Sequence, residues 1–266
     1  MKSSAMRLLS VGAIAMMGMI ASVSANHAWG PYHWARTQNP LTLNVGDNVS
    51  AAWDTHLDVA IADWNQSIVL DLTKTAGGAR SKNCRPTSGR IEVCSGAYGN
   101  NGWLGIAQIW VTGGEHITQA TTKLNDYYFA MAQYNTPAWR ALVTCQEVGH
   151  DFGLTHQDEN FNNPNLGTCM DYTNNPATNQ HPNQHDYDEL VTIYSHFDNF
   201  TTAGALTLPA AMPPAMGQID FDTPGQWGRL VHSAAGGRAQ AYDVDFGRGN
   251  HVITHVFWAD PQADAH

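Results

Sequence analysis

The stretch Thr144–Glu159, TCQEVGHDFGLTHQDE, carries metal-ligating and acid–base side chains at short spacing. Gln146 and His150 are four residues apart, so on a helix they project from one face, one turn apart. Glu147 lies about 100° around the helix from Gln146, beside that pair. A glycine three residues after His150 allows a sharp turn, so that His156 can fold back towards His150. Two metal ligands one turn apart, a third after a glycine turn and a carboxylate alongside are the geometry of a zinc hydrolase site.

The sequence around this stretch predicts the helix that the spacing requires. Thr136 is a good N-cap and Pro137 suits the first helical position. The helix should end near Gly153, because glycine readily takes the left-handed conformation that terminates helices. The helix face that carries Gln146 and His150 also carries apolar residues and therefore points inward: Trp139, Leu142 and Val143.

The segment QEVGHDFGLTH (Gln146–His156) resembles the long signature HExxHxxGxxH of the metzincin superfamily of zinc endopeptidases. Further along, TCMDY (Thr168–Tyr172) resembles the methionine turn of that superfamily, and the order of expected elements over residues 40–197 is similar. The signature is matched at four positions: Glu147, His150, Gly153 and His156.

The resemblance implies an α+β fold in which a twisted mixed sheet carries the active-site helix and a methionine turn. It implies a secreted zinc endopeptidase with Gln146, His150 and His156 as metal ligands. Glu147 would be the general base, which takes a proton from a metal-activated water and later passes it to the leaving amine.

The same resemblance assigns roles to three further segments. Met170 would form a hydrophobic floor beneath the metal, and Tyr172 would bind the metal or steady the oxyanion of the reaction. GWLGIAQIW (Gly102–Trp110) would be the edge strand of the sheet and would pair with an extended polypeptide substrate.

Gln146 stands where the signature has its first metal-binding histidine. An amide oxygen can bind a metal, but it is a harder and weaker donor for zinc than imidazole. Gln146 could bind zinc or another divalent metal, or it could form only hydrogen bonds while Tyr172, a nearby Asp or a histidine such as His181 or His185 completes the site. The third interpretation is a secreted peptide-binding module that has lost the metal and the activity. We favour a metal-bound enzyme, because a non-catalytic relative has no use for the carboxylate of Glu147.

The ends of the chain differ in character from its middle. Residues 1–25 have a basic start, an apolar run and small residues before a cleavage site near Ala25, which predicts a secretory signal peptide. Residues 26–200 are predicted to form the metalloprotease domain. A Pro/Ala/Gly-rich linker follows over 201–217, and 218–266 is predicted to be a small β-rich appendage.

Charge and composition limit the partners. The formal charge is −10 and becomes −12 without the two basic residues of the signal peptide. An acidic surface disfavours nucleic acid and anionic membrane as partners. We therefore expect a secreted monomer that acts on polypeptide.

Four cysteines lie beyond the signal peptide, which fits an oxidising compartment. Of the three possible pairings we favour Cys84–Cys94 with Cys145–Cys169. A cysteine-based zinc site is the competing interpretation, but the chain contains no CxxC pair.

Hydrophobic periodicity predicts the remaining elements. A loop is expected over 159–182, where Asn and Pro are dense. Asp158, Glu159 and the Asn-rich loop to Asn175 could bind calcium, although an ordinary solvated loop is the better interpretation because no fixed spacing of oxygen ligands is present. Helices are expected over 51–67 and 186–197. Strands are expected over 41–45, 68–74, 90–99, 102–115 and 116–126, with a hairpin at GRGN (Gly247–Asn250) in the C-terminal segment.

Overall fold

The computed structural model describes residues 26–205, 212–217, 221 and 223–261. The predicted signal peptide therefore lies outside the described residues. The strands are β1 (His33–Trp34), β2 (Leu41–Asn48), β3 (Leu70–Ala76), β4 (Arg90–Gly96), β5 (Trp103–Thr112), β6 (His116–Asn125), β7 (Arg229–Ala234), β8 (Ala239–Gly247) and β9 (Asn250–Trp258). The α-helices are α1 (Asp54–Trp64), α2 (Asp126–Phe129), α3 (Pro137–His150) and α4 (Gln184–Ile193).

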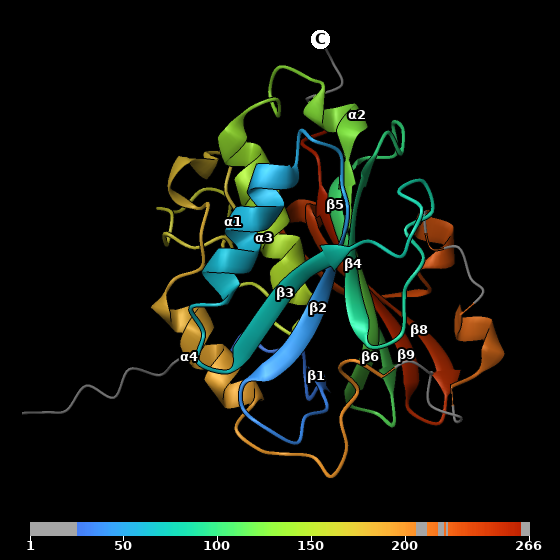
Figure 1. The fold of residues 1–266 in the computed structure, drawn as a ribbon. Helices are drawn as coiled ribbons and strands as arrows, with labels where there is room; N and C mark the ends of the chain where they lie inside the picture. The colour runs from blue at the N-terminus through green and yellow to red at the C-terminus, as the bar shows by residue number, and fades with distance from the viewer. Residues whose placement is uncertain (1–25, 206–211, 218–220, 222, 262–266) are drawn as a thin grey trace, which may run out of the picture.

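All of these strands belong to one nine-stranded mixed sheet (Figure 1). The order is β3-β2-β4-β6-β5-β9-β8-β7, and β1, which is not part of this order, pairs with β6. Strands β2, β3, β4 and β6 are parallel to their neighbours within that group, whereas β5, β9, β8 and β7 form antiparallel pairs. The mixed sheet with few helices agrees with the α+β class expected from the sequence.

The position of β5 corrects one prediction. The edge strand expected to pair with substrate lies inside the sheet, between β6 and β9. Strand β9 follows β5 in antiparallel register, with Ile109 opposite Ile253 and Ala107 opposite His255. The hydrogen-bonding edge of β5 is therefore occupied by the C-terminal segment of the same chain. Sequence periodicity identified both strands, but it does not encode which strands pair with each other in the sheet.

Buried side chains lie on both faces of β5. Ile109 and Val111 join the large core beneath the helices. Ile106 and Trp110 join a second cluster on the other face, together with Met216, whose carbonyl accepts a hydrogen bond from Trp110 Nε1 at 2.9 Å. This double burial explains why every residue of β5 is buried and why the strand reads as a nearly continuous apolar run.

Helix α3 forms where its start signals predict. The Thr136 side chain accepts a hydrogen bond from the Trp139 backbone N–H, and Pro137 is the first helical residue. Helix α1 lies beside α3 on one face of the sheet (Figure 1), and Trp64 Nε1 donates to the carbonyl of Cys145 at 3.1 Å. The two helices thus hold the candidate site against the sheet.

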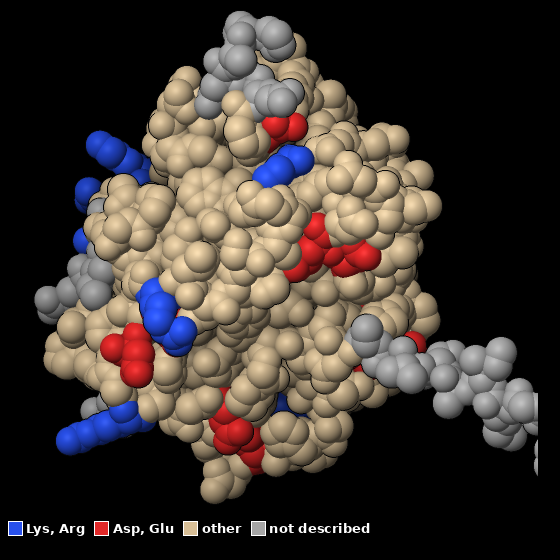
Figure 2. All heavy atoms as spheres, turned by 180° about the vertical axis from the view of Figure 1, so that it is seen from behind, with Lys and Arg blue, Asp and Glu red and all other residues tan. Residues whose placement is uncertain are grey.

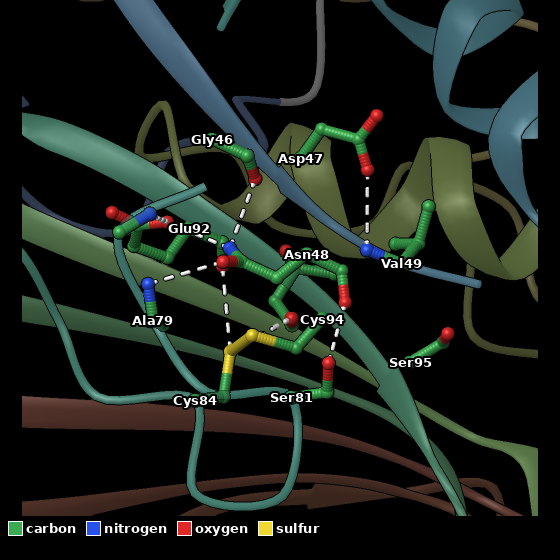
Figure 3. The surroundings of a disulfide bond; sticks show 12 residues. Gly46, Asp47, Asn48, Val49, Ala79, Ser81, Cys84, Glu92, Cys94 and Ser95 are labelled. Carbon is green, nitrogen blue, oxygen red and sulfur yellow. Dashed lines mark hydrogen bonds between the residues drawn. A yellow bond between two sulfur atoms is a disulfide. The ribbon is translucent and has the colours of Figure 1, made fainter. Parts of the chain in front are cut away.

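Both predicted disulfides are present, Cys84–Cys94 and Cys145–Cys169. Figure 3 shows Cys84–Cys94 beside Asn48, whose amide donates to Glu92 at 2.7 Å and accepts from the Ala79 backbone. Cys145–Cys169 ties α3 to the segment that contains Met170.

Charged residues are few in this chain, at 14% of the sequence. On the face shown in Figure 2, acidic side chains form small separate groups and the basic ones are isolated. Within the described residues, no helix is both long and apolar enough to span a bilayer.

Candidate metal centre

The end of α3 places three of the predicted site residues in the protein interior. Gln146, Glu147 and His150 are at most 2% exposed. Glu147 packs against β5 at Gly105, where an added Cβ would lie 2.7 Å from Glu147 Oε1. The missing side chain at Gly105 therefore makes room for the carboxylate.

Hydrogen bonds fix the tautomers of both predicted histidine ligands. His150 Nδ1 lies 2.8 Å from the carbonyl oxygen of Leu154, and this nitrogen must be the donor because a carbonyl cannot donate. His156 Nδ1 lies 2.9 Å from Glu159 Oε1. In each uncharged ring the lone pair is then on Nε2, as in histidines whose second nitrogen is held by an oxygen acceptor while Nε2 binds a metal.

The two imidazole rings lie close together. His150 and His156 have ring centroids 4.6 Å apart and ring planes at 88°. Burial lowers the pKa of His150 well below its usual value, and positive charge from nearby histidines adds to this effect. Burial also lowers the pKa of His156, although Glu159 opposes the shift. Both imidazoles are therefore uncharged at neutral pH, the form that binds metals.

Buried polar atoms without hydrogen-bond partners gather around these rings. Among the described residues they include both amide atoms of Gln146, both carboxylate oxygens of Glu147 and Nε2 of His156. Each such group costs about 1–3 kcal/mol when it is left unsatisfied. A divalent metal and its water would satisfy the donor set of one amide oxygen and two imidazoles, so these residues fit the ion that the sequence predicts.

The segment after the helix brings Met170 and Tyr172 next to α3. Met170 is fully buried, and a Cβ added at Gly149 of α3 would lie 2.8 Å from its sulfur. Tyr172 packs on His156, with ring centroids 4.3 Å apart. Its hydroxyl lies 3.5 Å from the carbonyl of Val256 in β9. The structure therefore brings Tyr172 beside the predicted ligands, and its role stays a prediction.

Burial and charge also act on the carboxylates. Burial raises the pKa of Glu147 well above its usual value, and the negative charge of Asp151 adds to the shift. Burial acts to raise the pKa of Glu159, but hydrogen bonds and charge from His156 and His232 outweigh it and lower this pKa to about 2. Glu147 is therefore a carboxylate that holds a proton readily, whereas Glu159 stays ionised.

Two histidines of this site were missed by sequence reasoning. His255 of β9 stacks on His150, with centroids 4.1 Å apart and planes at 8°. His232 of β7 donates to Glu159 at 2.8 Å, and Glu159 in turn orients His156. The predicted alternatives are elsewhere: His181 is exposed and bonded to Asp63, and His185 stacks on His27. No local spacing marks His255, because its partner lies more than a hundred residues earlier in the chain.

A pocket of about 380 Å³ opens onto one side of the centre. Its lining includes His156, Glu159 and His255 together with Trp29 from the N-terminal segment and His232 from β7. Gln146, Glu147 and His150 are not among the residues that line it. A ligand in the pocket would meet the imidazole of His232, whose side chain is 42% exposed, as well as the more buried imidazoles of His156 and His255.

Comparisons with known proteins add little to this geometry. The sequence matches no protein-family model and no curated protein. A solved structure that resembles part of the fold is high choriolytic enzyme 1, a hatching enzyme zinc-protease from Oryzias latipes (medaka fish). The likeness has a TM-score of 0.34 and 11% sequence identity, and it covers 61% of this chain and 94% of that chain. Such values do not establish a shared activity.

Proposed function

We propose that the chain is a secreted metal-dependent endopeptidase, with zinc or another divalent ion held by Gln146, His150 and His156. The observation that carries the proposal is that hydrogen bonds fix the tautomers of both histidines: His150 Nδ1 donates to Leu154, and His156 Nδ1 donates to Glu159. In both rings the lone pair that can bind a metal is then on Nε2. Histidines that bind metals typically donate their other ring N–H to an oxygen in this way.

The side chains divide the chemistry between them. A bound metal would supply Lewis acidity, which polarises a carbonyl and lowers the pKa of water. Glu147 would accept a proton on its carboxylate and return it to the leaving amine, a task suited to a carboxyl whose pKa burial raises. His255 would act as an uncharged imidazole facing the substrate, because burial and then the charge of His156 lower its pKa to about 3.

The substrate would enter through the pocket rather than along β5. Four side chains of β9 are at most 1% exposed: Val252, Ile253, Val256 and Phe257. Exposing them would cost roughly 1.5–3 kcal/mol each, or about 6–12 kcal/mol together. That is comparable to the total stability of a typical domain, about 5–15 kcal/mol. A pocket of 380 Å³ is within the usual range for small ligands, so it suits a short peptide segment.

The covered edge of β5 also favours a second candidate function. A metzincin-like protein whose strand edge is paired with its own β9 could serve as a peptide-binding module without catalysis. In that case the pocket would hold a peptide, and the Glu147 carboxylate would have no role in binding it.

Replacement of Glu147 separates the two functions. Glu147→Gln keeps the size of the side chain but removes the base. We expect the variant to retain the metal content of the wild type and to lose at least about 100-fold in the rate of peptide cleavage, the usual contribution of a general base. Metal content is measured on dialysed protein, and cleavage is measured on a library of short peptides. Equal cleavage by both proteins, or peptide binding without cleavage by either, would contradict an enzyme.

A further inference from the structure

We propose that the chain has a second metal site, formed by His33, His196 and Asp198 and suited to Zn²⁺. His33 lies in β1, while His196 and Asp198 follow α4, more than 160 residues later. One donor atom from each of the three side chains lies within 4.8 Å of the other two. The site shares no residue with the centre on α3.

The distances between donor atoms match a shared ion. His33 Nε2 and His196 Nε2 are 3.2 Å apart, and His33 Nε2 is 3.6 Å from Asp198 Oδ1. The distance from His196 Nε2 to the same oxygen is 3.9 Å. Ligands bonded at about 2.0–2.1 Å to a tetrahedral zinc ion lie about 3.3 Å apart. Small side-chain adjustments would therefore bring all three to bonding distance.

Hydrogen bonds from neighbouring groups orient the ligands for this role. His33 Nδ1 donates to the carbonyl of Pro31 at 2.7 Å, which in the uncharged ring leaves the lone pair on Nε2, facing the other donors. Asp198 Oδ2 accepts the Arg36 backbone N–H at 2.8 Å, which directs Oδ1 towards the imidazoles. His116 Nε2 lies 3.2 Å from Oδ1 and helps to hold the carboxylate in place. Metal-ligating histidines and carboxylates typically have such partners.

A separate observation points to a ligand at the same place. A pocket of about 230 Å³ is lined by His33 and His196 together with Glu115 and Glu189. Glu189 is 5% exposed, and its Oε1 has no hydrogen-bond partner among the described residues. A buried carboxylate oxygen without a partner is costly unless a cation or its water lies nearby. Two carboxylates beside the histidines also make the pocket favourable for a dication.

The proposed ion would tie distant parts of the chain together. His33 belongs to the N-terminal segment, and residues Ala28 and Gly30 of that segment line both this pocket and the one beside α3. Asp198 and His196 lie where the chain leaves α4. Bound zinc would therefore fix one wall of the pocket beside the first centre.

The test uses Zn²⁺ alone and the full chain with the first centre disabled. In a His150→Ala background, equilibrium dialysis should find one zinc per chain, and zinc should raise the melting temperature because it binds the native state. Adding His196→Ala should abolish both effects. The His196 side chain is 52% exposed, so its removal should leave the fold intact.

Two controls make the result decisive. Adding His181→Ala to the same background removes an exposed histidine that also contacts an aspartate, and it should change neither zinc content nor melting shift. Asp198→Asn should lower zinc affinity at least tenfold. Absence of zinc from the His150→Ala protein, or equal zinc content with and without His196, would overturn the site. Neither result bears on cleavage by the α3 centre, which is measured separately.

Discussion

Gln146 is the residue on which the chemistry of the α3 centre depends most. Its side chain is fully buried, and neither amide atom has a hydrogen-bond partner among the described residues. A glutamine that only filled space would be costly here, because a buried amide without partners destabilises the fold. Under the proposed function, metal ligation would satisfy Oε1 of this buried side chain.

Replacing Gln146 tests this assignment. Gln146→His should tighten zinc binding at least about tenfold, equivalent to about 1.4 kcal/mol, because imidazole is the better donor for zinc. Gln146→Leu, which is similar in size and has no donor atom, should weaken binding. The measurement is competitive zinc titration against a chelator, carried out in a His196→Ala background so that only the α3 centre is counted. Equal affinity in all three proteins would show that residue 146 is not a ligand.

Sequence reasoning could place the residues of α3 but not those that approach it from elsewhere. Gln146, Glu147 and His150 follow from helical spacing, and His156 follows from the glycine turn. His255 reaches His150 only through the pairing of β9 with β5, a contact between distant segments. His33 and His196 also come from distant segments of the chain, and their side chains are in contact. No local pattern encodes such contacts, because tertiary packing alone decides them.

At the scale of elements, the pairing of β5 with β9 is the feature that most changes the expected function. The sequence predicts both strands from their apolar runs and the hairpin from GRGN (Gly247–Asn250). The sequence does not show that β9 pairs with β5 or in which register, so the extension of the sheet beyond β5 could not be predicted. The division of the chain into a protease domain and a β-rich appendage stays a prediction, although β9 is hydrogen-bonded directly to β5.

Locking β9 to β5 tests whether the substrate needs that edge. Gln108 and Thr254 are opposite each other, and their side chains are 3.1 Å apart. A disulfide formed in the double variant Gln108→Cys/Thr254→Cys would hold the strands together. We expect short-peptide cleavage within about twofold of the unlocked single variants, since the pocket and not the strand edge admits the substrate. Loss of cleavage only in the locked protein would show that β9 must move.

At the scale of the whole molecule, the buried histidines make folding sensitive to pH. Burial and the charge of His156 lower the pKa of His255 to about 3, whereas an unfolded chain has the ordinary value of about 6.5. Between these values the unfolded state binds a proton that the folded state does not. His255 therefore has no such effect on the free energy of unfolding above pH 6.5. As the pH falls from there towards 3, it destabilises the fold progressively.

This linkage gives a measurable difference between variants. In metal-free protein, lowering the pH from 7 to 5 should reduce the free energy of unfolding by about 2 kcal/mol more in the wild type than in His255→Gln. Denaturant titration at the two pH values provides both numbers, and the glutamine keeps a polar side chain at that position. An identical loss in both proteins would mean that His255 takes up its proton in the folded state.

Chelator-sensitive cleavage of peptides by the purified full chain tests the proposed metal-dependent peptidase. We expect that the wild type cleaves, that a chelator stops cleavage and added zinc restores it, and that zinc-loaded Glu147→Gln remains inactive. Cleavage that persists in metal-free protein, or that is equally fast in Glu147→Gln, would contradict a metal-dependent peptidase built on α3.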